Sequence, residues 1–185
     1  MEKVFGDYLV KYKKETPVET RPQTMGTDLD HPSILDIQTC YSRIPIEDSL
    51  MSSDCPYIAL LFTAEYAPPC ATFLTQFTAF VNEANKDPAH KRFDIVVVNC
   101  DRNESDFKTH IAKMPLAWYN VPFEATKVME QLEDIACAAS IPKVTILKPS
   151  ASLSEPFLKD IKASILKNQN MDTAVKEVME KLHKK

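Results

Sequence analysis

The stretch Tyr57-Ile-Ala-Leu-Leu-Phe-Thr63, which runs on into Ala64-Glu65-Tyr66-Ala67-Pro68-Pro69-Cys70, decides the fold of this 185-residue chain. Its first seven residues form a continuous apolar run, which is typical of a strand buried on both faces of a sheet. The two prolines favour the first turn of a helix, where the missing N–H groups would have had no partner. Apolar residues then recur at helical spacing: Phe73, Phe77, Phe80, Val81 and Ala84.

Strands and helices continue to alternate toward the C-terminus. Further buried strands are expected at residues 93–98 and 144–147. Helices are expected at residues 104–113, with Asn103 as N-cap, and near residues 124–135 and 172–183. The alternation predicts an α/β fold, with a central mixed β-sheet flanked by helices, in one domain of residues 37–185.

Residues 1–36 differ in composition, and we expect them to form an extended N-terminal arm. Residues 16–32 contain three prolines together with Gly26, threonines and charged residues. Proline has no backbone N–H to donate to a helix or a sheet, so a long regular element is not expected here. The arm begins with apolar residues suited to docking on a partner protein: Val4, Phe5, Tyr8, Leu9 and Val10. Docking on a larger complex is one interpretation, and packing back on the chain's own domain is the other.

Composition excludes several classes of function. The formal charge is 22 − 26 = −4 without a basic stripe, which argues against nucleic acid as a partner. The chain has only two glycines, compared with thirteen prolines. It therefore cannot form the glycine-rich loops that bind phosphates and dinucleotides. No apolar run approaches the roughly 20 residues of a membrane span. Nothing in the sequence calls for a cofactor, so none is expected.

The cysteines suggest a reducing compartment. No two of the five have C-x-x-C spacing, and no histidines cluster with them, so we expect no metal site. The chain does not open on an apolar signal segment, which argues against a secreted disulfide scaffold. We expect an intracellular protein, in the cytoplasm or in a cytoskeletal or mitochondrial assembly. The five are Cys40, Cys55, Cys70, Cys100 and Cys137.

The strand–turn–helix at residues 57–84 resembles the active-site elbow of the thioredoxin fold, specifically of the tryparedoxin and nucleoredoxin family. The motif of that family is Trp-Cys-Pro-Pro-Cys. Three further segments are similar to family patterns in the same order: Asn99-Cys-Asp-Arg-Asn-Glu-Ser-Asp-Phe107, Ala112-Lys-Met-Pro115 with Val121-Pro122-Phe123, and Ser140-Ile-Pro142, whose proline is cis in the family. The resemblance covers about residues 55–148.

The resemblance also implies what this chain lacks. In the family, thiol–disulfide exchange begins at the first motif cysteine, where the helix N-terminus favours a thiolate. That position is Ala67 here, and alanine has no sulfur with which to form a mixed disulfide. Tyr66 stands in place of the family tryptophan, and Ala71 stands where a basic residue is common. We therefore expect the ordinary dithiol mechanism to be absent.

The second motif cysteine leaves two interpretations open. Cys70 aligns with the resolving cysteine of the family, and it is either a small buried apolar residue or a monothiol that accepts glutathione or a partner sulfur. Cys100 follows the second buried strand on the same sheet edge, either as a free thiol or paired with Cys70.

By the same resemblance, Pro142 implies a binding site for an extended peptide. In the thioredoxin fold, the residue before the cis proline, here Ile141, offers its backbone to a partner strand. Trp118, Tyr119 and Phe123 either form an exposed aromatic patch near Pro142 or belong to the core.

Three functions follow as hypotheses. The first is a redox-inactive thioredoxin-like protein that serves as a protein-binding or structural subunit of a larger assembly. The second is a monothiol oxidoreductase or glutathione-linked protein that acts through Cys70. The third is a chaperone-like module that holds client peptides at Ile141 and Pro142.

Overall fold

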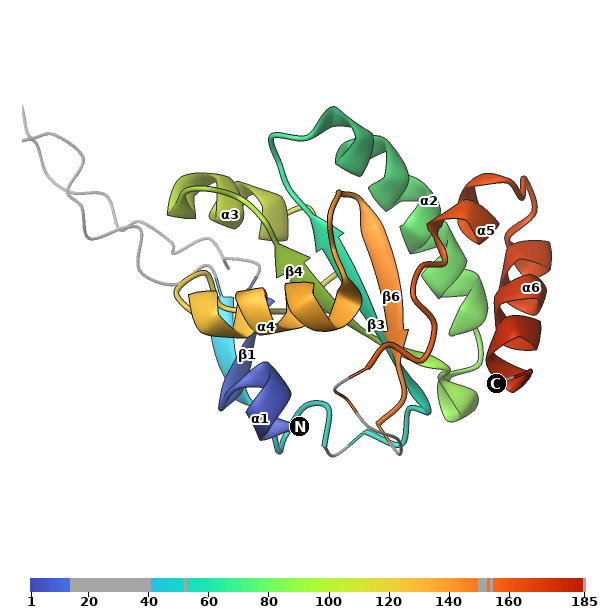
Figure 1. The fold of residues 1–185 in the computed structure, drawn as a ribbon, viewed down its shortest axis with the longest axis horizontal. Coiled ribbons are helices and arrows are strands. Elements are labelled where there is room, and N and C mark those ends of the chain that lie inside the picture. The colour runs from blue at the N-terminus through green and yellow to red at the C-terminus, as the bar shows by residue number, and fades with distance from the viewer. Residues whose placement is uncertain (14–40, 52, 150–152, 154, 185) are drawn as a thin grey trace, which may run out of the picture.

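The computed structural model describes residues 1–13, 41–51, 53–149, 153 and 155–184 (Figure 1). The strands in these ranges are β1 (Tyr8–Tyr12), β2 (Tyr41–Pro45), β3 (Tyr57–Thr63), β4 (Phe93–Asn99), β5 (Tyr119–Asn120) and β6 (Lys143–Leu147). The helices are α1 (Glu2–Phe5), α2 (Pro68–Ala84), the 3-10 turn η2 (Pro88–His90), α3 (Glu104–Ile111), α4 (Thr126–Ala136), α5 (Lys162–Leu166) and α6 (Met171–His183).

The strands form one mixed sheet in the order β2-β1-β5-β4-β3-β6. β3 runs parallel to β4, with Tyr57 opposite Phe93 and Thr63 opposite Asn99. It runs antiparallel to β6, with Phe62 opposite Lys143. The predicted α/β fold with a central mixed sheet and flanking helices is confirmed.

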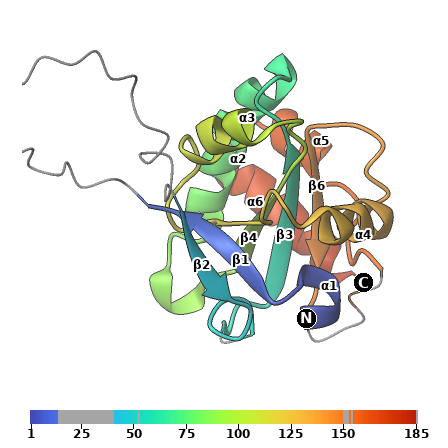
Figure 2. The same cartoon turned by 90° about the vertical axis from the view of Figure 1, so that its left-hand side faces the viewer.

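Helices cover both faces of the sheet, α2, α5 and α6 on one side and α1 and α4 on the other (Figures 1 and 2). Successive residues of β3 point to opposite faces. Ala59 and Leu61 therefore join the core beneath α2, whereas Leu60 and Phe62 join the core beneath α4. This explains why all seven residues of β3 are buried and why the sequence there is uninterrupted by polar residues.

The phenylalanine face of α2 packs into the core on its side of the sheet. Phe73, Phe77 and Phe80 are all buried, and successive ring centroids along this row lie 5.9 and 6.2 Å apart. Full burial of each such side chain contributes on the order of 1.5–3 kcal/mol. α6 packs against the same core through Ala174, Val175, Val178 and Leu182, so the two helices form one layer.

The prediction of an extended arm at residues 1–36 is wrong for its first part. β1 lies inside the sheet, between β2 and β5, and Phe5, Leu9 and Val10 are fully buried. Leu9 and Val10 alternate between the two faces, so a five-residue strand fills core positions on both. Gly6, with φ of 72°, turns the chain from α1 into β1. Residues 14–36 of the expected arm, and Cys40, lie outside the described residues.

The longer predicted elements are confirmed with small shifts of boundary. Asn103 caps α3 as expected, because its side-chain oxygen accepts a hydrogen bond from the N–H of Asp106 at 2.9 Å. β2, β5 and the five-residue helix α5 were not anticipated. Among the described helices, none combines the length and the apolar character that crossing a bilayer requires.

Candidate functional site

The elbow between β3 and α2 has neither a side-chain cap nor a free N–H at the start of its helix. Ala67 is the N-cap in extended conformation, and its side chain makes no capping hydrogen bond. Pro68 and Pro69 have no N–H, and the N–H of Cys70 donates to the carbonyl of Ala67 at 2.8 Å. Although the helix dipole still points here, these first positions give an anion nothing to bind.

The surface of the elbow is apolar and open. Tyr66 is 52% exposed, and the guanidinium of Arg102 lies 5.4 Å from the centre of its ring. Pro68 and Pro69 are exposed, whereas Cys70, one turn into the helix, is only 1% exposed. The exposed side chains of this elbow are therefore a tyrosine and two prolines, and the sulfur is covered.

A buried polar network lies at the sheet edge beneath the elbow. Oδ1 of Asp101 accepts the N–H of Glu65 at 2.8 Å, and its Oδ2 lies 3.0 Å from Nδ1 of His110. The Asp101 side chain is fully buried and that of His110 nearly so. Asn99 accepts the N–H of Asp101 at 2.8 Å, and the hydroxyl of Thr63 lies 3.5 Å from Nε2 of His110. The network ties the ends of β3 and β4 to α3.

The sequence interpretation did not identify His110 and Asp101 as parts of the site. One signal was available, because His110 lies with Phe107 and Ile111 on the inward face of α3. A histidine on an apolar helix face needs a buried polar partner.

An ion pair on the surface also holds the elbow between β3 and α2 in place. Lys113, just beyond the end of α3, binds the carboxylate of Glu65. The loop that carries Leu116, which is 53% exposed, is therefore attached to the elbow. Together with the buried network, this contact holds the backbone of the elbow from two sides.

The other described thiols are also free, and two of them are poor nucleophiles. Burial, with the nearby Glu133 carboxylate, raises the pKa of Cys100 to about 12. Burial, with Asp94 nearby, raises the pKa of Cys55 to about 12 as well. Cys137 is exposed, and it is the residue in left-handed conformation that ends α4. The structure contains no Cys70–Cys100 disulfide.

The predicted peptide site is only partly assembled as expected. The Ile141–Pro142 peptide bond is cis, and it precedes Lys143, which pairs with Phe62 beside the elbow. Ile141 is half-buried and Pro142 is buried. The inclusion of Trp118 at this site is wrong. Its ring is buried in the α2-side core, 5.4 Å from the ring centre of Phe77, because β5 holds the neighbouring backbone against the middle of β4.

The site contains no cluster of metal ligands. Within the described ranges, no three His, Cys, Asp or Glu side chains gather as a metal ion would need. The carboxyl of Asp101 is committed to the ring of His110 and to the backbone N–H of Glu65, and the ring also contacts the side chains of Thr63 and Asn99. The elbow therefore exposes an apolar surface whose backbone is held in place by the buried network and the ion pair.

Comparison with known proteins gives a consistent family. A family model described as thioredoxin-like matches residues 56–153, just over half of the chain. Tryparedoxin of Trypanosoma brucei brucei is 33% identical over 85 residues, which are 46% of this chain and 56% of that protein. Probable nucleoredoxin 3 of Oryza sativa subsp. japonica is 32% identical over 96 residues, 52% of this chain and 20% of that protein. The chain thus spans only part of the length of these relatives.

Solved structures agree on the fold. Tryparedoxin II from C. fasciculata superposes with a TM-score of 0.52 at 27% identity, covering 60% of this chain and 69% of that one. Thioredoxin from Wuchereria bancrofti superposes with a TM-score of 0.57 at 24% identity, covering 75% of this chain and 90% of that one. The sequence resemblance to tryparedoxin is therefore matched at the level of the fold.

Proposed function

This chain belongs to the thioredoxin-like family, and from that premise we propose that it is a redox-inactive member that binds other proteins through its elbow, as a subunit of a larger assembly. The observation that carries the proposal is Ala67 at the N-cap of α2, with Cys70 buried behind it. The proposal takes Ala67 as the counterpart of the first motif cysteine, as the resemblance of the motif to that of tryparedoxin and nucleoredoxin implies. A reducing compartment and membership of a complex remain predictions.

The elbow surface supports a binding role. Tyrosine and arginine are enriched among the residues that anchor protein interfaces, and Tyr66 and Arg102 lie together here on the outside of the molecule. Leu116 adds a large exposed apolar side chain on the loop that Lys113 attaches to the elbow. The buried Asp101–His110 pair supports the same proposal, since a preformed surface loses little entropy on binding.

The first experiment tests the absence of redox chemistry. Purified protein is assayed for reduction of insulin with dithiothreitol and, separately, with glutathione, beside an ordinary thioredoxin. We expect no turnover above the reductant alone, and no difference between the wild type and Cys70→Ser. Turnover near that of thioredoxin, lost in Cys70→Ser, would establish the monothiol alternative instead.

The second experiment tests the binding surface. The tagged chain is expressed in its native cells, and the native mass of the complex that contains it is measured. We expect Tyr66→Ala combined with Leu116→Ser to release the chain as a free monomer. Leu166→Ser is the matched control, since Leu166 is 50% exposed on α5, outside the elbow, and should leave the complex intact. A wild-type chain that migrates as a free monomer, or a complex that survives the double change, would contradict the proposal.

A further inference from the structure

One exposed cation of the elbow surface has no partner of opposite charge. Arg102 lies on the outside of the molecule, and its guanidinium is 5.4 Å from the ring centre of Tyr66. Within the described part of the chain this is the only contact of the Arg102 side chain, and no described carboxylate forms an ion pair with it. The five N–H donors of the guanidinium therefore remain available to an acceptor from outside.

The charged groups on the α3 side of Arg102 are already engaged. Asp106 accepts a hydrogen bond from the side chain of Asn103 at 2.7 Å, and it lies in the first turn of α3, where the helix dipole favours a negative charge. Two further carboxylates bind lysines: Glu65 binds Lys113, and Glu104 binds Lys108. These carboxylates therefore do not neutralise Arg102.

The charged groups on the α4 side of the elbow have other contacts as well. The carboxylate of Glu133 lies 4.0 Å from the thiol of Cys100 and does not reach Arg102. The ammonium of Lys143, which follows the cis proline, donates to the carbonyl of Cys137 at 2.7 Å. Arg102 is therefore the charged side chain of the described elbow whose donors are all unused.

The backbone on which Tyr66 and Arg102 stand is fixed. Glu65, which precedes Tyr66, donates its N–H to Asp101, which precedes Arg102. Asn103, on the other side of Arg102, caps α3. A surface fixed in advance loses little entropy on binding. An arginine held in this way suits a carboxylate, since its planar fork can donate two parallel hydrogen bonds to the two oxygens.

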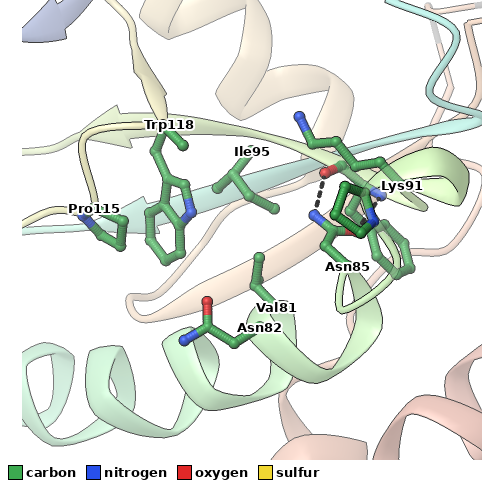
Figure 3. A pocket seen from close by; sticks show the side chains of 10 residues that line it. Val81, Asn82, Asn85, Lys91, Ile95, Pro115 and Trp118 are labelled. Carbon is green, nitrogen blue, oxygen red and sulfur yellow. Dashed lines mark hydrogen bonds between the residues drawn. The ribbon is translucent and has the colours of Figure 1, made fainter.

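The described pocket between α2 and the loop before β5 offers no comparable group (Figure 3). Its volume is about 370 Å³, and Lys91 is the charged residue of its lining. The ammonium of Lys91 lies 2.5 Å from the carboxylate of Asp94, and Asn85 donates to the carbonyl of Phe93 at 2.8 Å. A charge on a partner is therefore not matched at this pocket.

The side chains around Arg102 at the elbow are apolar. Tyr66 is 52% exposed and Leu116 is 53% exposed, and Pro68 and Pro69 are exposed as well. An ion pair that forms among apolar side chains is partly shielded from water, which strengthens the attraction between its charges. A fitting partner therefore combines one carboxylate with an apolar side chain.

We propose that the partner of the elbow places an aspartate or glutamate carboxylate on the guanidinium of Arg102, with an apolar side chain beside it on Tyr66. This inference rests on the proposed protein-binding function and specifies the chemistry of the partner.

A competition in the native cells tests the role of the charge. The wild-type chain and a variant carry different tags and are expressed together at equal levels, and quantitative mass spectrometry gives their ratio in the isolated complex. We expect Arg102→Gln to be depleted about tenfold or more, because it loses the charge-assisted hydrogen bonds of the guanidinium. Arg92→Gln is the matched control and should compete equally, since Arg92 is exposed outside the elbow and forms no ion pair with a described residue.

The outcomes separate this inference from the proposed function. Equal incorporation of Arg102→Gln and the wild type would overturn the inference, and the proposed function would stand if Tyr66→Ala with Leu116→Ser still releases the chain. A wild-type chain that belongs to no complex would overturn both.

A second variant identifies the acceptor group. Arg102→Lys keeps a positive charge and places a primary amine at this position. A water-soluble carbodiimide activates a contacting carboxylate, and the amine then displaces the activating group as a urea and forms an amide. We expect mass spectrometry of the isolated complex to find residue 102 joined to an aspartate or glutamate of another protein, and no such product from Arg92→Lys. A cross-link to a phosphorylated side chain, or no cross-link from residue 102, would overturn the proposal.

Discussion

The carboxylate of Asp101 holds the backbone N–H of Glu65 at 2.8 Å, and this contact joins the end of β4 to the turn that begins α2. The other oxygen of the same carboxylate faces His110 of α3, so one buried side chain connects three elements. The elbow therefore has its shape fixed from within, although it has no thiol at its N-cap.

Replacing Asp101 by asparagine should destabilise the protein by about 2–4 kcal/mol. An amide oxygen satisfies only one of the two groups that the carboxylate now serves, and the other is left buried and unpaired. Urea denaturation followed by circular dichroism measures the change. Asp48→Asn makes the same chemical change at an exposed position and should remain within about 0.5 kcal/mol of the wild type. Equal stabilities for the two variants would mean that the network contributes little.

Shortening the N-terminal segment should unfold the domain, contrary to the behaviour of a detachable arm. Leu9→Ala removes a fully buried side chain and should destabilise the protein by about 2–5 kcal/mol, and deletion of residues 1–13 should prevent cooperative unfolding altogether. Lys3→Ala, in α1 but exposed, is the control. Thermal denaturation of all three variants decides the matter. A deletion variant that melts like the wild type would restore the arm interpretation.

The described thiols should react with iodoacetamide in an order set by exposure. Cys137 is exposed and should be alkylated first at neutral pH. Cys55 and Cys100, whose pKa values are raised to about 12 by burial, contain almost no thiolate under those conditions. Cys70 should react slowly because reagent cannot reach it. Peptide mapping by mass spectrometry gives the order directly, and Cys70 ahead of Cys137 would favour the monothiol enzyme.

Placing a cysteine at the N-cap should restore only weak reductase activity. Ala67→Cys supplies the missing sulfur next to Cys70, but Tyr66 and Ala71 also differ from the family pattern. We expect insulin reduction at least about tenfold slower than that of an ordinary thioredoxin, which corresponds to roughly 1.4 kcal/mol in the barrier. The double variant Ala67→Cys with Cys70→Ser is the control for single-thiol reactions. Full activity from the single change would show that the rest of the site has been kept in working order.

The carboxylate of Glu177 should stabilise the packing of α5 against α6 in a pH-dependent way. It accepts from Lys181, Lys167, Asn168 and Ser164, and these hydrogen bonds, led by that of Lys181, lower the pKa of Glu177 to about 2 from its usual 4.5. The stabilisation is complete above pH 4.5 and is lost as the pH falls through about 2. Because the side chain is partly exposed, Glu177→Gln should lose only about 1 kcal/mol at neutral pH.

The control for this variant is Glu180→Gln, which alters an exposed carboxylate on the same helix. Denaturation at a series of pH values should show the difference between wild type and Glu177→Gln shrinking as the solution is acidified. A difference that grows on acidification would have the wrong sign for a carboxylate with a lowered pKa.

The longest elements were predictable because their patterns are local. β3 is a nearly continuous apolar run, β4 contains the apolar run 95–98, and α2 repeats phenylalanine at one helical face, so the residues alone specify each type of structure. β1 was missed because its neighbour on one side, β5, comes more than a hundred residues later in the chain. A pattern read over a short window contains no information about pairing at that distance.

The site was predictable in its backbone and less so in its side chains. The order of strand, turn and helix placed Ala67 and Cys70 where the structure has them. Trp118 was misplaced because the orientation of its ring depends on the pairing of the two-residue strand β5, which no local pattern reveals. His110 was missed because its partners, in β3, at the end of β4 and just after β4, meet it only in the folded chain.

The position of β1 in the sheet also constrains how the protein is made. Val10 pairs with Asn120, so it leaves the ribosome 110 residues before its partner (120 − 10 = 110). At synthesis rates of about 5–20 residues per second, the nascent strand waits several seconds or more for its partner. During that interval Leu9, Val10 and the edge of the strand are open to other chains or to chaperones. The sheet can therefore be completed only after β5 has been translated.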